Sequence, residues 1–97
     1  MTHYRISKKA EQDLQNIWLY GVKYYDEQQA DNYFFELIDK CSLVAKEPLH
    51  YQSVEHIRAG YRRTICGMHS IYYRICSDDG VVEIMAIIKN QDIQRYS

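Results

Sequence analysis

The spacing of apolar residues changes about halfway along the chain. Before Pro48, apolar side chains recur every three or four residues, and after it they alternate with polar ones. A period near 3.6 is typical of a helix with one buried face, and a period of two is typical of a strand. The pattern therefore predicts a helical first half and a β-rich second half.

Two helices are predicted in the first half. Residues 2–6 alternate like a short strand, and Ser7 offers a side-chain oxygen that can cap a helix over residues 7–25. The apolar stripe of this helix is Ala10, Leu14, Ile17, Gly21 and Tyr24. A second helix starts at Asp26 or Glu27, and its stripe is Ala30, Tyr33, Phe34, Leu37, Ile38, Cys41 and Val44. The short connection predicts an antiparallel helical hairpin.

Three strands are predicted in the second half, over residues 61–66, 70–76 and 81–88. Asp79-Gly80 between the last two is typical of a tight hairpin turn, so these strands should pair antiparallel. Alternation predicts a helix-covered face formed by Ile71, Tyr73, Ile75, Val82, Ile84, Ala86 and Ile88. The opposite, open face would carry Tyr72 and Arg74, together with Arg62 if Ile65 marks the buried side of its strand.

These elements predict one α+β domain over residues 1–97. It would contain an N-terminal strand, the helical hairpin and a three-stranded antiparallel meander, with the helices packed on one face of a single sheet. The chain has 97 residues, of which 46% are hydrophobic and 26% charged, and such a chain can form one core.

The charge distribution narrows the classes of partner. A net charge of -1 argues against a protein that coats nucleic acid, so we expect no direct sequence-specific binding to nucleic acid. The sequence has no run of about 18 apolar residues and no signal peptide, which indicates a cytoplasmic protein without membrane contact.

The three cysteines and the histidines could in principle bind a metal ion. Cys41, Cys66 and Cys76 lack the close paired spacing of zinc sites, and their odd number favours reduced thiols. We therefore expect neither a metal nor a cofactor.

A local excess of arginine suggests a binding surface. Residues 56–77 contain four arginines and no acidic residue. Guanidinium groups bind carboxylates through paired hydrogen bonds, so the set could anchor an acidic partner on the open face: Arg58, Arg62, Arg63, Arg74 and the neighbouring Tyr72. The alternative is a set of solvated arginines whose exposed ion pairs contribute about 0–1 kcal/mol each.

The first helix carries more aromatic surface than one buried stripe needs. Trp18, Tyr20 and Tyr25 could be covered by a helix of a partner that folds on binding. Alternatively, Trp18 rests on the second helix.

The stretch Ile57-Arg58-Ala59-Gly60-Tyr61-Arg62, followed by Gly67, His69, Ile71, Tyr73 and Arg74, resembles the motif of ParE toxins from bacterial type II toxin-antitoxin pairs. The resemblance implies a toxin that inhibits DNA gyrase by binding the enzyme-DNA complex. It also implies a ParD-type antitoxin that neutralises the toxin in a hetero-oligomer.

In this family the C-terminal segment is associated with toxicity, which here points to Lys89, Asp92, Arg95 and Tyr96. The sequence departs from the family pattern at Met85, where an Arg is common, and at Ile88, where a His is usual.

Two alternatives remain open within this fold. Related RelE-type toxins cleave messenger RNA on the ribosome, which requires an acid, a base and cations. We find no convincing acid-base pair, read His69 as packed or capping, and therefore expect no catalytic residues and no enzyme. The second alternative, suggested by Met85 and Ile88, is a non-toxic relic that binds an antitoxin.

Overall fold

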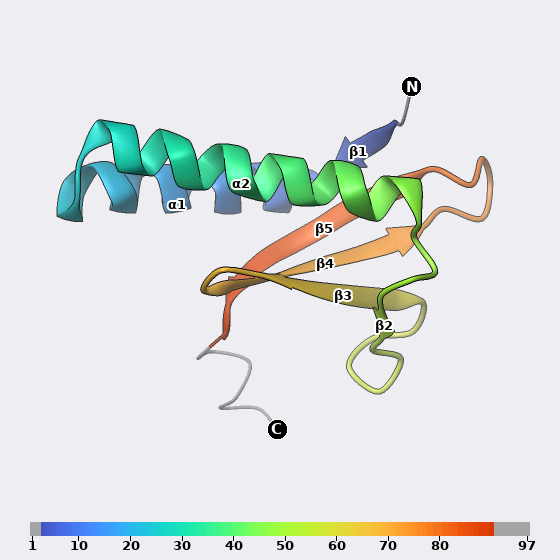
Figure 1. Cartoon of the computed structure of the whole chain (residues 1–97). Helices are drawn as coiled ribbons and strands as arrows, with labels where there is room; N and C mark the ends of the chain where they lie inside the picture. Colours follow the sequence, from blue (N-terminus) through green and yellow to red (C-terminus); the bar gives the residue numbers. More distant parts are fainter. Residues whose placement is uncertain (1–2, 91–97) are drawn as a thin grey trace.

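The computed structural model describes residues 3–90 and places two helices over one face of a five-stranded sheet (Figure 1). The expected α+β fold, with a helical hairpin on one side of a single sheet, is confirmed. The elements are β1 (Tyr4–Ile6), α1 (Lys8–Tyr24), α2 (Glu27–Lys46), β2 (Gln52–Ser53), β3 (Tyr61–Cys66), β4 (His69–Ile75) and β5 (Val82–Lys89).

The strand order is β1-β5-β4-β3-β2. β1 runs parallel to β5, and the other neighbours are antiparallel. β2 was not predicted, because its two residues are too few to show a period. It pairs with β3 through Gln52 opposite Arg63 and Ser53 opposite Arg62.

Side-chain caps begin both helices. The Ser7 hydroxyl accepts a hydrogen bond from the Ala10 N–H at 3.1 Å, and the Asp26 carboxylate accepts one from the Gln29 N–H at 2.7 Å. Each bond satisfies an N–H that has no partner within its helix. Both helix starts lie within one residue of the predicted positions.

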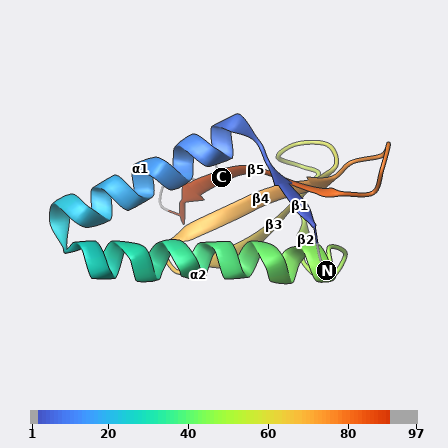
Figure 2. The same cartoon turned by 90° about the horizontal axis from the view of Figure 1, so that it is seen from above.

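The helical hairpin projects beyond the ends of the strands, as Figure 2 shows from above. The two helices cross closely near this free end, where a Cβ on Gly21 would lie 2.9 Å from the Cβ of Ala30. Tyr24 lies past the sheet and is 57% exposed. The prediction that Tyr24 belongs to the core is therefore wrong, because no strand lies beneath that turn among the described residues.

The main core lies between the hairpin and the sheet. It confirms most of both predicted helix stripes and the inward positions of β4, and its buried members are Ala10, Leu14, Leu37, Cys41, Val44, Ile71, Tyr73, Val82, Ile84 and Ile87.

A bulge in β5 changes which side chains face the helices. Tyr73 pairs with Ile84 and Tyr72 pairs with Ala86, so Met85 is an extra residue. The Met85 carbonyl accepts a hydrogen bond from the Ser7 hydroxyl at 3.0 Å. The bulge turns Ala86 and Ile88 away from the helices, and the prediction that both lie on the helix-covered face is wrong.

The face opposite the helices carries a second, smaller cluster. Val54 is fully buried against Tyr72 and Ala86, with Tyr61 and Ile88 partly buried around them. Val54 is held there by its N–H, which donates to the Tyr61 carbonyl at 2.9 Å. This face is therefore partly covered by the segment that joins β2 to β3.

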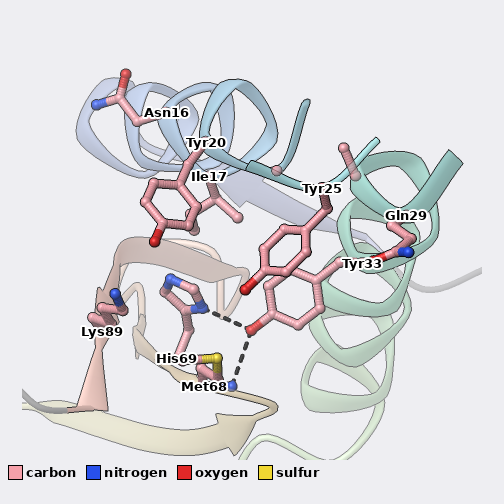
Figure 3. Close-up of a pocket in the computed structure, with 11 residues that line it drawn as sticks. Asn16, Ile17, Tyr20, Tyr25, Gln29, Tyr33, Met68, His69 and Lys89 are labelled. Carbon is pink, nitrogen blue, oxygen red and sulfur yellow. Dashed lines mark hydrogen bonds between the residues drawn. The ribbon is translucent and has the colours of Figure 1, made fainter. Parts of the chain in front are cut away.

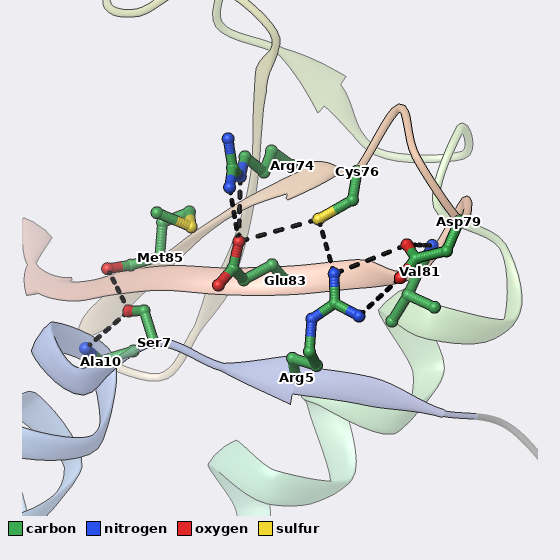
Figure 4. A network of polar contacts seen from close by, with 9 residues as sticks. All are labelled: Arg5, Ser7, Ala10, Arg74, Cys76, Asp79, Val81, Glu83 and Met85. Carbon is green, nitrogen blue, oxygen red and sulfur yellow. Dashed lines mark hydrogen bonds and ion pairs between the residues drawn. The ribbon is translucent and has the colours of Figure 1, made fainter.

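Polar contacts fasten β1 to the β4–β5 hairpin (Figure 4). Arg5 donates to Asp79 at 2.8 Å and to the Cys76 sulfur at 3.0 Å, while Arg74 donates to Glu83 at 2.8 Å. The Arg5 contacts join segments that are distant in sequence, whereas the Arg74–Glu83 pair links the two neighbouring strands of the hairpin. Within residues 3–90, neither helix is long and apolar enough to span a bilayer.

Candidate functional site

A cavity of about 430 Å³ opens where the free end of the helical hairpin overhangs the turn between β3 and β4 (Figure 3). Both helices, the turn and the end of β5 contribute to its lining: Asn16, Ile17, Tyr20, Gly21, Tyr25, Gln29, Ala30, Tyr33, Met68, His69 and Lys89. A volume of this size lies in the range of about 300–1,000 Å³ typical of ligand clefts.

The floor of the cavity is organised by Tyr33. Its hydroxyl donates to the Cys66 carbonyl at 3.2 Å, accepts from the Met68 N–H at 3.1 Å and lies 2.6 Å from Nδ1 of His69. One side chain of α2 thereby fixes both the β3–β4 turn and the first residue of β4.

Gly67 makes this contact possible. Its φ of +58° is a conformation that glycine adopts readily, and a Cβ at this position would lie 2.7 Å from the Tyr33 ring. A side chain at position 67 would have to displace the Tyr33 ring for the turn to approach α2 this closely.

The Tyr33–His69 pair is neutral around pH 7. Burial, followed by the charge of Lys89, lowers the pKa of His69, and Asp13 opposes this shift. Burial raises the pKa of Tyr33, which therefore stays protonated. Nδ1 of His69 is engaged with Tyr33, and Figure 3 shows the other ring nitrogen turned toward the side where Tyr20 and Lys89 lie.

Lys89 supplies the positive charge of the cavity. Its ammonium lies 5.3 Å from the centre of the Tyr20 ring, within the range of a cation–π contact. None of the described lining residues is a carboxylate. Asp13, which acts on His69 from outside the lining, already accepts from Lys9 at 2.8 Å and from the Ile87 N–H at 2.9 Å.

A second hollow lies between the two helices and involves no residue of β3, β4 or β5. It is lined by Ile6, Glu11, Leu14, Gln15, Trp18, Asp31, Phe34, Phe35 and Ile38. The Trp18 indole donates to the Asp31 carboxylate at 2.7 Å, so Trp18 rests on the second helix. The three aromatic residues predicted as one partner surface are therefore divided, because Tyr20 and Tyr25 line the other cavity.

The predicted open arginine face is wrong at Arg62. Arg62 pairs with Tyr73 and shares the helix-covered side, where it donates to the Tyr51 carbonyl at 2.8 Å. Arg63 and Arg74 pair with Tyr72 and Tyr61 and lie on the other side. The prediction placed Ile65 on the buried side of its strand, but Ile65 is 59% exposed and lies on the outer side of β3. Because side chains alternate along a strand, an error of one position places every side chain on the wrong face.

Most of the predicted arginine set already has partners. Arg63 donates to Gln52 at 3.2 Å, Arg74 donates to Glu83, and the Arg58 guanidinium lies 5.5 Å from the centre of the Tyr61 ring. Tyr72 is buried beneath Val54, so the prediction that it is an accessible contact residue is wrong as well.

The C-terminal segment is described only in part. Lys89 lines the cavity, whereas Asp92, Arg95 and Tyr96 lie outside the described residues. Ile88 packs against the second cluster. Cys41, Cys66 and Cys76 carry free thiols, and residues 3–90 contain no group of three metal-ligating side chains placed to hold an ion.

Sequence reasoning missed the cavity itself. The sequence predicts Tyr33 in a core stripe and His69 as packed or capping, and their contact agrees with both predictions. Neither prediction indicates a cavity beside them. The available signals in the sequence were Gly67 at the expected turn between two strands and the tyrosines that follow Trp18 on the first helix.

Comparison with known proteins finds a matching family. A family model described as "ParE toxin of type II toxin-antitoxin system, parDE" matches residues 4–93. The chain is 38% identical over 89 residues to Toxin ParE1 of Caulobacter vibrioides, covering 91% of this chain and 88% of that one. It is 26% identical over 95 residues to Toxin ParE1 of Mycobacterium tuberculosis H37Rv, covering 97% and 96%.

A solved structure has the same fold. The chromosomal ParDE TA system from P. aeruginosa contains a chain that superposes with a TM-score of 0.79 at 15% identity. The match covers 92% of this chain and 96% of that chain.

Proposed function

This chain belongs to the ParE toxin family of type II toxin-antitoxin systems, and from that premise we propose that it stalls DNA gyrase by binding the enzyme-DNA complex and is neutralised by a ParD-type antitoxin. The observation that carries the proposal is the family match over residues 4–93, which includes every helix and strand described. Binding rather than catalysis is the mode of action we infer.

The cavity chemistry supports a binding role. Tyr33 is held as a protonated phenol by burial, and its hydroxyl is committed to the turn and to His69. The pair therefore orients backbone and ring, while Lys89 is the charged group that a ligand would meet. Large apolar side chains also remain exposed around the opening, as expected for a surface that meets another protein.

The arginines on the side away from the helices remain our candidates for contact with an acidic surface of gyrase or of the antitoxin. Arg58 and Arg63 are the better two, because Arg74 is already paired with Glu83. Arg62 is left out, since it lies on the helix-covered side.

Induced expression and a purified gyrase assay test the proposal together. We expect growth arrest on induction, rescue by the ParD-type antitoxin, and loss of supercoiling when the purified chain is added to gyrase and plasmid DNA. The double variant Arg58→Ala/Arg63→Ala should inhibit less than the wild type. The control Lys8→Ala/Lys46→Ala removes the same charge from the two helices and should inhibit normally.

Other outcomes identify the alternatives. Cleavage of messenger RNA on ribosomes, with gyrase unaffected, would replace the proposal with a RelE-type activity. Normal growth despite confirmed expression and antitoxin binding would replace it with a non-toxic relic.

A further inference from the structure

We propose that the cavity beneath the hairpin tip is the anchor site for the antitoxin, and that it receives a large apolar side chain of the antitoxin whose neighbouring carboxylate pairs with Lys89. This inference rests on the proposed function, because it takes the ParD-type antitoxin as the partner.

The shape of the site favours a peptide segment as its occupant. The cavity would hold one or two side chains, and its rim continues outward through Tyr20, Tyr25 and Met68, which are 50%, 64% and 61% exposed. A small metabolite would fill the hollow and leave this rim in water. A segment of polypeptide would cover both, which is how an apolar groove usually binds a partner segment.

The charge of the site favours an acidic segment. Lys89 is the ammonium group in the lining, and none of the described lining residues is a carboxylate. Within the described residues, Lys89 forms no ion pair; its near neighbour is the face of the Tyr20 ring.

The second hollow does not compete for the same segment. Its lining includes two acidic side chains, Glu11 and Asp31, and no cation among the described residues. Asp31 is also occupied by the Trp18 indole. An acidic segment would therefore be repelled from the groove between the helices and attracted to the cavity beside the sheet.

The site is pre-organised for binding. Tyr33 fixes the turn that bears Met68, and the close crossing of Gly21 and Ala30 fixes the two helices above it. A partner would therefore spend little of its binding energy on ordering the walls of the cavity.

Titration calorimetry with the full-length toxin and its full-length ParD-type antitoxin tests whether the charge of Lys89 contributes to binding. Lys89→Met removes the ammonium but keeps an unbranched side chain, and we expect it to weaken binding by at least about tenfold. Lys40→Met is the matched control, because the Lys40 ammonium lies 5.3 Å from the centre of the Tyr51 ring and does not line the cavity. This control should bind like the wild type.

A second pair of variants tests, independently of charge, whether the antitoxin occupies the cavity. Gln29→Trp adds bulk at the mouth of the cavity and should weaken binding at least about tenfold. Gln28→Trp adds the same ring one residue earlier, at an exposed position outside the lining, and should not. Circular dichroism and urea unfolding of all four variants establish that each one is folded.

The outcomes separate this inference from the proposed function. Wild-type affinity in both Lys89→Met and Gln29→Trp would overturn the anchor site while leaving the toxin-antitoxin pairing intact. If the wild-type chain did not bind the antitoxin at all, both proposals would fall. If the isolated toxin formed dimers that Gln29→Trp abolished while antitoxin binding persisted, the occupant would be a second copy, contrary to the proposal.

Discussion

At the scale of single residues, the contact between His69 and Tyr33 shows how half-buried polar groups at the floor of the cavity find partners. The Tyr33 hydroxyl satisfies a backbone N–H, a backbone carbonyl and a ring nitrogen at once. A polar group shielded from water without a partner would cost about 1–3 kcal/mol. The histidine stays neutral, because burial and Lys89 both disfavour its charged form.

This neutral histidine predicts a pH dependence of stability. The pKa of His69 in the folded state lies below its ordinary value of about 6.5, so as the pH falls from 7 to 5.5 the unfolded chain takes up a proton that the folded chain resists. The free energy of unfolding should therefore decrease over this interval. In His69→Gln the decrease should be smaller, measured by urea unfolding at several pH values.

The same substitution at the exposed His50 is the control and should leave the pH dependence of the wild type in place. An equal decrease in wild type and His69→Gln would show that His69 does not cause it.

At the scale of elements, Ser7, which directly follows β1, ties α1 to β5. Its hydroxyl accepts from the first turn of α1 and donates to the carbonyl of Met85 at the β5 bulge, while its N–H donates to the Ile84 carbonyl at 2.9 Å. The start of α1 is therefore tied to the point where β5 changes the direction of its side chains.

Because of this double role, the two helix caps should differ in energy. Ser7→Ala should lower the free energy of unfolding by about 2 kcal/mol, since it loses the cap and leaves the Met85 carbonyl without its side-chain donor. Asp26→Ala removes only the cap of α2 at an exposed position and should cost about 1 kcal/mol. Equal costs in urea unfolding would mean that the bond to Met85 contributes nothing.

At the scale of the whole molecule, the fold depends on a turn of the sheet lying directly against a helix. The β3–β4 turn approaches Tyr33 of α2 so closely that Gly67 has no room for a side chain. This contact closes the floor of the cavity while the hairpin tip extends over it (Figure 3).

Two alanine substitutions separate this packing from backbone strain. Gly80 has a φ of +71° with open space around it, so Gly80→Ala should cost about 1–2 kcal/mol through its backbone conformation alone. Gly67→Ala carries the same backbone cost and must also displace the Tyr33 ring, so it should destabilise the protein more. Chemical unfolding of both variants measures the difference, and equal losses would show that Tyr33 moves aside freely.

The sequence alone determined the class of fold, because periodicity and caps are local. The stripes of both helices, the Ser7 cap, the Asp79-Gly80 turn and the motif from Ile57 to Arg74 each depend on neighbours within a few residues or on recognisable spacing. These features sufficed to predict the α+β fold and the family that the comparisons show.

Which side chains meet depends on contacts between segments that are distant along the chain. The bulge at Met85 turns Ala86 and Ile88 to the face away from the helices. The register of β3 places Arg62 on the helix-covered face, and Val54 covers Tyr72 on the other one. The cavity exists because the tip of the α1–α2 hairpin extends past the ends of the strands beneath it. Alternation within a strand cannot reveal such features, because one unpaired residue or a shift of one position exchanges the two faces.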